Sequence, residues 1–327
     1  MANKDIIRWG IIGCGDVTEV KSGPAYQQTP GFALHAVMRR DEAKGRDYAR
    51  RHGVPVYHSA AEDLIADPDI DAVYVATPPD SHLHYGLLVA AAGKPCCIEK
   101  PLSPSYAESL SIREAFVGAG VPLFVAYYRR TLPRFKQVKE WLDAGRIGTV
   151  RHLNWVLSWG PNALDLSGEP NWRTEARVAP GGYFDDLASH GLDLITHFLG
   201  KIDSVYGVSD NQQGLYSAKD AFAACWRHGS GATGAASWNF GSYGNEERVD
   251  IFGAEGRITF SVFNEAPVVL ETAAGREVIT IEHPPTVHLP HVRLMYRQLA
   301  GEAVVHPANG DTALHTSWVM DRILGKL

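Results

Sequence analysis

The chain has 327 residues, which is too many for one small core and fits about two domains. Apolar residues make up 45% of the chain and charged residues 21%, so disordered and collagen-like classes are excluded. A formal net charge of −6 argues against a general nucleic-acid or anionic-membrane binder.

No apolar run reaches the roughly 20 residues needed to cross a bilayer, and residues 1–10 lack the apolar stretch of a secretion signal. The four cysteines (Cys14, Cys96, Cys97 and Cys225) show no metal-ligand or redox spacing. Cys96 and Cys97 are adjacent, so on a strand they point to opposite faces. We therefore expect a cytoplasmic protein with reduced, mostly buried thiols and no nucleic-acid or membrane partner.

Strand-like and helix-like segments alternate over residues 1–126. Ser59 and Glu62 have the spacing of a capping box before a short helix that ends near Ala66. Two longer predicted helices, 81–92 and 105–119, are each followed by a glycine of the type that ends helices, Gly93 and Gly120. The predicted strands are 6–12, 33–38, 71–76, 95–98 and 122–126. Repeated strand–helix–strand units predict right-handed crossovers and a doubly wound parallel sheet.

The second half of the chain has a different pattern. Strand-like segments are joined by short glycine-bearing turns at 228–231 and 253–256, which is typical of antiparallel neighbours. Helical patterns cover 184–199, ending at Gly200, and 312–324. The predicted strands are 150–157, 204–208, 221–226, 234–238, 249–252 and 257–260. We predict an α/β protein with one domain over 1–126 and a second α/β domain, with an open and mostly antiparallel sheet, over 127–327.

Gly13-Cys14-Gly15 follows the first predicted strand and opens a helix, which is where a dinucleotide fingerprint must lie. Gly13 would allow a tight turn, and Gly15 would let backbone N–H groups approach a pyrophosphate. Thr18 replaces the third glycine of the motif, and Gly23-Pro24 interrupts the helix early. The alternative is a turn without a ligand.

The second predicted strand ends at Arg39-Arg40, and Lys44 follows one helical turn later. An NAD-selective enzyme usually has an acidic residue there to bind the ribose, whereas a 2′-phosphate is a bidentate partner for arginine. These three basic residues favour NADP. The alternatives are a solvated basic loop and an NAD site in which Asp41 or Glu42 serves the ribose.

Glu99-Lys100-Pro101 ends the predicted strand at 95–98, and ligands bind beyond the carboxyl ends of parallel strands. Pro101 favours an extended backbone at Lys100, which directs the lysine beyond the sheet. There it could polarise a substrate oxygen or transfer its proton. The alternative is an ordinary surface lysine.

Asp186 and His190 are four residues apart in the predicted helix 184–199, and Asp193 and His197 continue the same stripe. On one helix face their side chains would be about 5–6 Å apart. A carboxylate beside an imidazole raises the imidazole pKa and orients the ring, as general acid–base catalysis requires. The alternative is a helix whose polar residues serve capping and solvation.

Other candidates depend on single residue types. Tyr128, Trp172 and Tyr183 could stack on a sugar ring, although aromatic residues more often form cores. Arg129 and Arg130 could reach an anion or lie at the surface. His82 with His84, or His283 with His288 and His291, could form a metal pair, but no Cys or carboxylate set completes a metal site, so we expect none.

Together these motifs resemble the Gfo/Idh/MocA family, the glucose–fructose oxidoreductase and inositol dehydrogenase group. The resemblance covers both halves in the family order. It rests on Gly13-Cys14-Gly15, residues 76–82, Ala92-Gly93-Lys94-Pro95, Glu99-Lys100-Pro101-Leu102, Trp172-Arg173 and Gly181-Gly182 through Asp186, His190 and Asp193. Thr18 and Ala188 depart from the small residues or glycine of many relatives. The resemblance implies a Rossmann domain, a nicotinamide cofactor, hydride transfer at a hydroxyl or carbonyl carbon of a sugar or cyclitol, and a homodimer or homotetramer built on the open sheet.

The resemblance also implies roles for individual residues. Lys100 matches the lysine between nicotinamide and substrate, and Asp186 and His190 match a helix pair in which His190 exchanges the proton. We expect Tyr128 and Tyr183 to join these three at the substrate. The expected cofactor contacts are Gly13, Gly15, Asp16, Val17, Arg39, Arg40, Lys44, Thr77, Pro78, His82, Glu99, Lys100, Arg129, Trp172 and Arg173.

The predicted function is an NADP-preferring oxidoreductase of polyhydroxylated substrates, with NAD possible. It requires Lys100 and His190 to act over the same nicotinamide ring. The alternatives are an NAD-dependent glycoside hydrolase of the same family and a non-catalytic NADP sensor. Substrate choice would depend on the loops 160–177 and 282–291.

Overall fold

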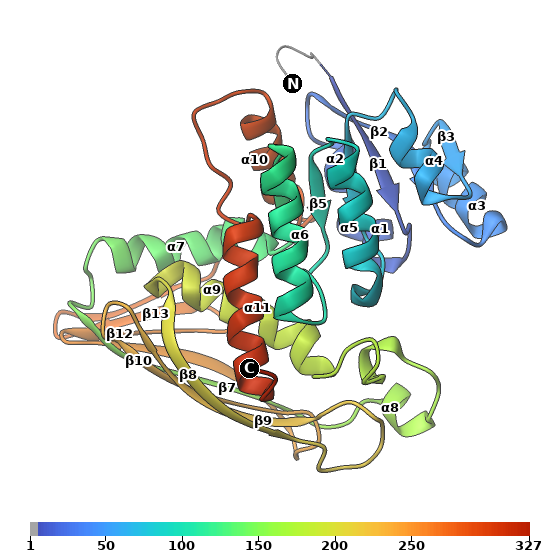
Figure 1. Cartoon of the computed structure of the whole chain (residues 1–327). Coiled ribbons are helices and arrows are strands. Elements are labelled where there is room, and N and C mark those ends of the chain that lie inside the picture. The colour runs from blue at the N-terminus through green and yellow to red at the C-terminus, as the bar shows by residue number, and fades with distance from the viewer. Residues whose placement is uncertain (1–5) are drawn as a thin grey trace. The chain divides into compact units, whose positions relative to one another are not determined.

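A computed structural model describes residues 6–327 of the chain, which forms two compact units. The first unit combines Met1–Tyr128 with Pro284–Leu314, and the second combines Arg129–His283 with His315–Leu327. The domain limits expected from the sequence are contiguous, whereas each compact unit is built from two segments. Figure 1 shows the path of the chain from its blue N-terminal part to its red C-terminal helix.

The first unit contains a six-stranded parallel sheet in the order β3-β2-β1-β4-β5-β6. The order reverses at β1, so the sheet is doubly wound, as the sequence predicted. Its strands are β1 (Ile7–Ile12), β2 (Phe32–Met38), β3 (Val56–His58), β4 (Ala72–Val75), β5 (Cys96–Ile98) and β6 (Leu123–Val125). Its helices are α1 (Asp16–Val20), α2 (Gly23–Gln27), α3 (Glu42–His52), α4 (Ala61–Ala66), α5 (His82–Ala91), α6 (Tyr106–Ala119) and α10 (Leu289–Leu299).

Both faces of this sheet are buried under separate hydrophobic clusters. Cys96 belongs to one cluster and Cys97 to the other, so the two thiols point to opposite faces as predicted. The returning segment completes both layers: Met295 packs in one cluster and Ala313 in the other. The near-continuous apolar sequences of β4 and β5 follow from burial on both sides.

Local capping explains where several helices begin and end. The Ser105 hydroxyl accepts a hydrogen bond from the Glu108 N–H at the start of α6, and Gly120 ends that helix with a φ of +66°. The predicted capping box at Ser59 is wrong. Helix α4 begins at Ala61, and its N-cap is Ala60, which offers no side-chain hydrogen bond.

The second unit contains an eight-stranded sheet in the order β14-β13-β12-β11-β7-β10-β9-β8. Only β7 and β10 pair in parallel, so the prediction of a mostly antiparallel sheet is confirmed. Its strands are β7 (Val150–Trp159), β8 (Ile202–Asp210), β9 (Ala221–His228), β10 (Thr233–Asn239), β11 (Asn245–Gly253), β12 (Gly256–Phe260), β13 (Val268–Thr272) and β14 (Gly275–Ile279). Strands β3, β13 and β14 were not expected from the sequence.

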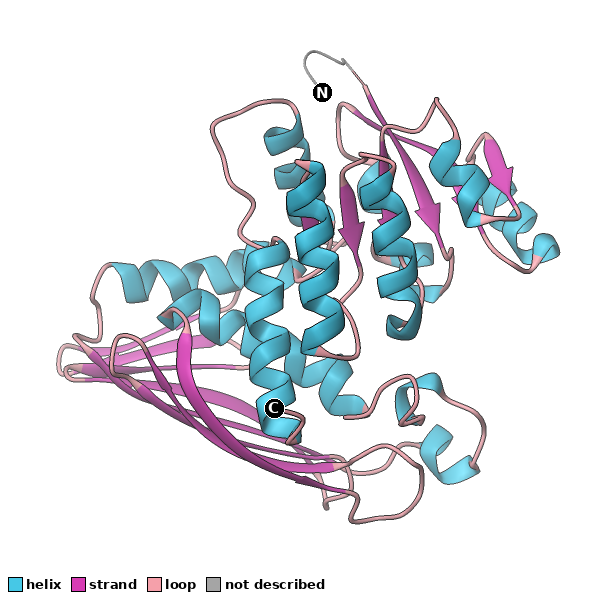
Figure 2. Cartoon of the chain, in the orientation of Figure 1, coloured by secondary structure: helices cyan, strands magenta, loops and turns pink. Residues whose placement is uncertain are grey.

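Helices cover one face of this second sheet and leave the other bare (Figure 2). The covering helices include α7 (Pro133–Asp143), α9 (Ser189–Leu199) and the end of α11 (Gly310–Leu324); a short helix, α8 (Ala163–Ser167), lies in a loop. Helix α9 approaches β7 closely, because a Cβ on Gly191 would lie 2.1 Å from the Trp155 ring. The bare face carries a cross-strand row that includes Tyr206, Cys225 and Ala235. Cys225 is therefore exposed, whereas the other three cysteines are buried.

The helix predicted over 184–199 is divided in the structure. A π-helical turn spans Phe184–Ala188, and the α-helix begins only at Ser189. Asp186 therefore lies in the π-turn, and His190 is the second residue of α9. The predicted i,i+4 geometry of a single α-helix does not apply to this pair.

Helix α9 is fixed by a buried ion pair. Arg130 Nε and Nη2 each donate to a carboxylate oxygen of Asp193 at 2.6 Å, and the two side chains are 4% and 1% exposed. Such a bidentate pair stabilises a fold only while both partners are present.

Among residues 6–327, no helix is long and apolar enough to cross a membrane.

Replacing Asp193 with alanine leaves the Arg130 charge buried without its carboxylate. We expect the free energy of unfolding to fall by about 3–5 kcal/mol, measured by denaturant titration. The control is Asp47→Ala, which removes an exposed carboxylate that pairs with Arg50 and Arg51, and should change the unfolding midpoint little. Equal midpoints for the two variants would contradict the role of the pair.

Candidate active site

Most of the predicted nucleotide residues follow the carboxyl ends of β1, β2, β4 and β5, whereas Arg129, Trp172 and Arg173 belong to the second unit. Gly13 follows β1 with a φ of +88°, and a Cβ there would lie 2.6 Å from the Thr77 methyl group. Gly15 differs, because no atom lies within 4 Å of the Cβ it lacks. Gly13 thus closes the turn against the loop after β4, and Gly15 leaves a backbone surface that a phosphate can approach. Asp16 and Val17 begin α1 directly after this surface.

Thr18 takes the place of the third glycine without opening the packing. Its side chain is buried, its hydroxyl donates to the Gly15 carbonyl at 2.7 Å, and its own carbonyl accepts from the Tyr48 hydroxyl at 3.0 Å. Gly23 supplies the close approach instead, since a Cβ there would lie 2.3 Å from the Thr18 carbonyl oxygen. The early interruption of the helix at Gly23-Pro24 is confirmed, because α1 ends at Val20 and α2 begins at Gly23.

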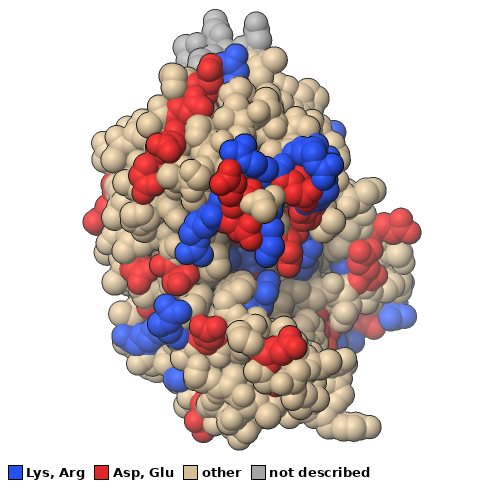
Figure 3. All heavy atoms as spheres, turned by 90° about the vertical axis from the view of Figure 1, so that its right-hand side faces the viewer, with Lys and Arg blue, Asp and Glu red and all other residues tan. Residues whose placement is uncertain are grey.

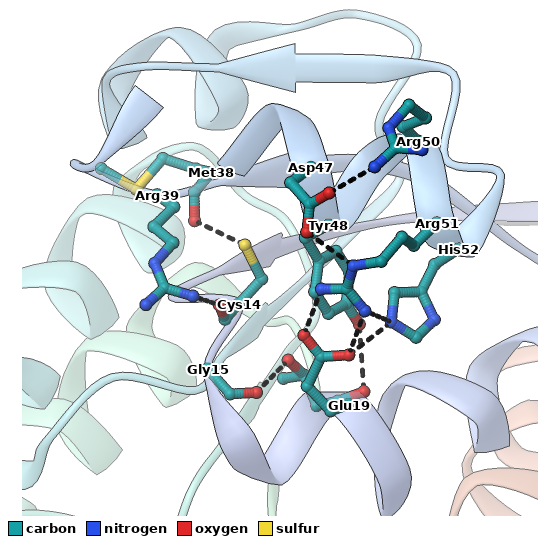
Figure 4. Close-up of polar contacts among 11 residues, drawn as sticks. Cys14, Gly15, Glu19, Met38, Arg39, Asp47, Tyr48, Arg50, Arg51 and His52 are labelled. Carbon is teal, nitrogen blue, oxygen red and sulfur yellow. Dashed lines mark hydrogen bonds and ion pairs between the residues drawn. The ribbon is translucent and has the colours of Figure 1, made fainter. Parts of the chain in front are cut away.

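Arg39 reaches back to the glycine turn. Its Nη1 donates to the Cys14 carbonyl oxygen at 2.7 Å, as Figure 4 shows. The other two predicted basic residues, Arg40 and Lys44, are exposed. The Lys44 ammonium lies 3.5 Å from Asp41 Oδ2. The two acidic residues that could have served a ribose have protein partners: Asp41 caps α3, and Glu42 accepts from Arg46 at 2.8 Å.

The charges around α3 are mixed. Glu19 accepts hydrogen bonds from Arg51, and its other partner is His52 at 2.7 Å (Figure 4). The Arg51 guanidinium, followed by the His52 ring, lowers the pKa of Glu19 to about 2. The face of the molecule in Figure 3 shows Lys and Arg interspersed with Asp and Glu, so this face is no continuous basic surface for a nucleic acid.

His82 joins two of the loops at this edge of the sheet. Its Nε2 lies 2.8 Å from the Thr77 carbonyl oxygen, and its Nδ1 lies 3.1 Å from that of Pro101. The ring is fully buried, and burial lowers its pKa. His82 therefore positions Thr77, Pro78 and the segment after β5 rather than presenting its ring to a ligand.

Lys100 and Glu99 lie directly after β5. One Glu99 oxygen accepts from the buried Tyr74 hydroxyl at 2.5 Å, and the other accepts from the Lys100 N–H at 3.1 Å. These bonds hold the backbone from which the half-buried Lys100 side chain extends; the peptide bond to Pro101 is cis. Tyr128 follows β6 and stacks on His288, with ring centroids 4.2 Å apart.

The second unit contains a pocket of about 830 Å³. Three predicted site residues, Arg173, Tyr183 and Asp186, line it together. Arg173 Nε donates to Asp186 Oδ2 at 2.8 Å, and its guanidinium lies 4.4 Å from the Trp172 ring centroid. The remaining lining combines aromatic and amide side chains with the Asp165 carboxylate and several glycine and aliphatic residues; the aromatic and amide residues are Trp159, Phe240, Asn162, Asn171 and Asn245.

A hydrogen-bond network holds the loop that walls this pocket. The Tyr183 hydroxyl donates to Asp165 at 2.6 Å and accepts from Asn162 at 2.8 Å and Asn171 at 3.2 Å. Burial, followed by the Asp165 carboxylate, raises the Tyr183 pKa to about 12, so the hydroxyl stays protonated. The 160–177 loop was expected to govern substrate choice, but Asn162 and Asp165 were not predicted individually. Their signal was present, because Asn followed three residues later by Asp forms the capping box of α8.

His190 is buried on α9, and its ring meets the Phe263 ring edge-on with centroids 6.4 Å apart. Arg129 donates to the Val262 carbonyl oxygen at 2.5 Å, and its guanidinium lies 4.7 Å from the same Phe263 ring. Arg130 pairs with Asp193 and is buried rather than a surface residue.

Among residues 6–327, no three His, Cys, Asp or Glu side chains form a group that could hold a metal ion.

Comparison with known proteins matches both units to one family. Residues 7–127 match the oxidoreductase family with an NAD-binding Rossmann fold, and residues 135–259 match the GFO/IDH/MocA C-terminal domain. The chain is 36% identical to oxidoreductase P35 of Formosa agariphila over 98% of both chains. It is 28% identical to myo-inositol 2-dehydrogenase of Thermotoga maritima, over 82% of this chain and 79% of that protein.

The structure of levoglucosan dehydrogenase in complex with NADH and levoglucosan superimposes with a TM-score of 0.85, covering 97% of this chain and 96% of that chain. At 21% identity this similarity concerns the fold. The two family matches, and the relative that is similar over 98% of both chains, are consistent with the glycine turn and the two sheets of the structure. The chain therefore belongs to the Gfo/Idh/MocA family of NAD(P)-dependent oxidoreductases.

Proposed function

We propose that this protein oxidises or reduces a neutral sugar or cyclitol with NADP as its preferred cofactor. The observation that carries the substrate class is the pocket of the second unit. Its charged lining residues are Asp165, Arg173 and Asp186, and the Arg173–Asp186 pair cancels one charge of each sign. Amide groups, the Tyr183 hydroxyl and aromatic rings then suit a polyhydroxylated ring better than a phosphate or carboxylate.

The names of relatives support this substrate class. One curated relative is a myo-inositol 2-dehydrogenase, and a structural relative was solved with levoglucosan, which is an anhydrosugar. Both compounds are uncharged and carry several secondary hydroxyl groups. The reaction that we propose for this chain is likewise at a carbon that bears a hydroxyl or carbonyl group.

The residues at the edge of the first sheet fit a nicotinamide dinucleotide. The positive φ of Gly13 and the open space at Gly15 allow a pyrophosphate to approach the backbone. When bound, the nicotinamide supplies or accepts the hydride. Arg39 contacts the glycine turn with one of its N–H groups and has others for a 2′-phosphate, whereas Asp41 and Glu42 have protein partners.

We assign the proton chemistry to the chain's own groups. In the oxidation direction His190 accepts the proton of the substrate hydroxyl while the hydride leaves its carbon, and a carbonyl results. Lys100 stabilises the negative charge that develops on the oxygen. Asp186 and Arg173 orient the substrate from the pocket wall, and Tyr183 holds that wall in place.

The first test is a screen at the absorbance band of the reduced cofactor, with levoglucosan, myo-inositol, aldoses and ketoses and with both NADP and NAD. Turnover of a neutral polyol supports the proposal. Tight NADPH binding without turnover of any compound would favour a sensor. A cofactor that stays bound while a glycosidic bond is hydrolysed would favour the glycoside hydrolase.

Lys100→Met should lower kcat/KM by about a hundredfold or more, because the substrate oxygen loses its cation while the cofactor loops remain. The affinity for NADPH, measured by fluorescence titration, should change less than about twofold. A matched control is Lys94→Met, at the opposite end of β5, where the ammonium donates to the Asp67 carbonyl at 2.7 Å. Wild-type turnover in Lys100→Met would remove Lys100 from the mechanism.

Arg39→Asp should weaken NADPH binding roughly a hundredfold, since a charge-assisted phosphate contact is replaced by repulsion. The affinity for NADH should change much less. Arg46→Asp on the exposed side of α3 controls for the change in net charge. An equal loss of both affinities would mean that Arg39 only supports the glycine turn, and equal affinity of the unmutated protein for NADH and NADPH would contradict NADP preference.

We also propose that a second copy of the chain covers the bare face of the second sheet. Tyr206 and Val208 are 68% and 70% exposed there, and small residues lie beside them on β9 and β10. The same face carries Arg248 paired with Asp250, so charges of both signs are available to a second copy. A two-fold interface of this kind would give a dimer, or a tetramer with a second contact.

Tyr206→Asp combined with Val208→Asp should convert the oligomer to monomer, because two charges would be buried without partners. Light scattering after size-exclusion chromatography gives the mass. Val117→Asp, which puts a charge at an exposed apolar position on α6 of the first unit, is the control. An unchanged mass of the double variant, or a monomeric wild type, would refute this interface.

A further inference from the structure

Residues 261–266 form a loop after β12 that is held by three buried charged side chains from elsewhere in the second unit. Glu247, Arg129 and Arg134 are 9%, 9% and 1% exposed. Burying three charges carries a large desolvation cost, which must be offset by well-formed hydrogen bonds. All three bind this one short loop, so its position is strongly determined.

Glu247 holds the donor groups of the loop. Its carboxylate accepts the N–H groups of Val262 at 3.0 Å and Phe263 at 3.3 Å, and the Ser261 hydroxyl. It also accepts the indole N–H of Trp155 at 3.1 Å. One carboxylate therefore fixes both the loop and a ring that projects from β7.

The two arginines hold the acceptor groups. Arg129 donates to the Val262 carbonyl oxygen at 2.5 Å, and Arg134 donates to those of Asn264 and of Ala266, the latter at 2.5 Å. The backbone of the loop is thus fixed from both sides, by a carboxylate on its N–H groups and by guanidinium groups on its carbonyls.

Glu247 accepts the indole N–H of Trp155 and the backbone N–H of Phe263, and the rings of these two residues contact consecutive residues of α9. Phe263 meets the His190 ring at 72°, with centroids 6.4 Å apart. Trp155 packs on the backbone of Gly191, where a Cβ would lie 2.1 Å from its ring. Phe263 is itself placed by the Arg129 guanidinium at 4.7 Å and the Trp159 ring at 5.9 Å.

We propose that Glu247 is a positioning residue for His190, acting through Phe263 and Trp155. The proposal rests on the proposed function, in which His190 exchanges the substrate proton. A proton-transfer group must be held close to one geometry, and a displacement of about 1 Å can lower the rate about a hundredfold. Phe263 limits rotation of the imidazole, and Trp155 sets the depth of α9 at Gly191.

The test is Glu247→Gln. Glutamine keeps one acceptor oxygen but places an NH₂ donor where the second oxygen accepts the Phe263 N–H and the Ser261 hydroxyl. We expect kcat to fall about ten- to a hundredfold, with KM and NADPH affinity changed less than about twofold. The pH profile of kcat should shift, because the environment of the imidazole changes. Levoglucosan and myo-inositol are the reference substrates, or whichever screened polyol turns over fastest.

Phe263→Leu tests the same link without altering a buried charge. It should reproduce the loss of kcat and the shifted pH profile. In the double variant, Glu247→Gln with Phe263→Leu, the fold-decrease in kcat should be smaller than the product of the two single decreases, because both substitutions disturb the same contact with His190.

A matched control is Asp220→Asn, a buried carboxylate that holds another loop of the second unit through the N–H groups of Gln212 and Gln213. We expect both Asp220→Asn and Glu247→Gln to lower Tm, because each weakens a buried hydrogen-bond network, but Asp220→Asn should leave the pH profile unchanged. A wild-type kcat and pH profile in Phe263→Leu, or the same pH shift in Asp220→Asn, would overturn the inference. An active His190→Asn variant would instead overturn the proposed role of His190 itself.

Discussion

The second unit depends on how α9 is fixed to its sheet. Arg130 and Asp193 form a buried bidentate ion pair that sets the position of the helix. Gly191 then allows contact with Trp155 that any side chain would prevent. Both constraints lie within three residues of His190. The orientation of that imidazole is therefore a property of the fold rather than of a flexible side chain.

The two units place their functional groups by different physical means. In the first unit the parallel sheet brings the loops after β1, β2, β4 and β5 to one edge. Residues distant in sequence therefore lie close together without bonding to each other. Buried groups such as His82 and Glu99 then tie those loops together. In the second unit a mostly antiparallel sheet supports α9 on its covered face, and hydrogen bonds to the Tyr183 hydroxyl shape the pocket wall. The first arrangement suits an extended dinucleotide, and the second suits a compact ring with many hydroxyl groups.

Much of the fold could be predicted because it is encoded locally. Gly120 is the C-cap of α6, Gly93 directly follows the C-cap of α5 with a φ of +65°, and glycine turns marked the hairpins of the second sheet. Edge strand β14 was missed because it is largely polar and half exposed, which weakens its alternation. Helix α10 was missed although Leu289, Val292, Met295 and Leu299 follow helical spacing.

The sequence predicted which residue types form the candidate site, but not how their side chains contact one another. The Arg173–Asp186 pair, the network around Tyr183 and the π-turn at 184–188 result from tertiary contacts that no short motif encodes. Asp186 was expected to orient His190 from a regular α-helix; the structure places it in the π-turn instead, where its carboxylate accepts a hydrogen bond from Arg173. Glu247 gave no sequence signal, because an acidic residue on a strand usually faces solvent.

The discontinuous first unit has a consequence for biosynthesis. Its two hydrophobic clusters include Val292, Met295 and Ala308. The Tyr296 ring packs so closely on Gly31 that a Cβ on this glycine would lie 2.2 Å from the ring. A ribosome that has released residues 1–128 has therefore not yet supplied all the side chains that close this unit. Native packing of the earliest segment must wait until almost the whole chain has emerged, and a truncated product would leave apolar surface open to chaperones and proteases.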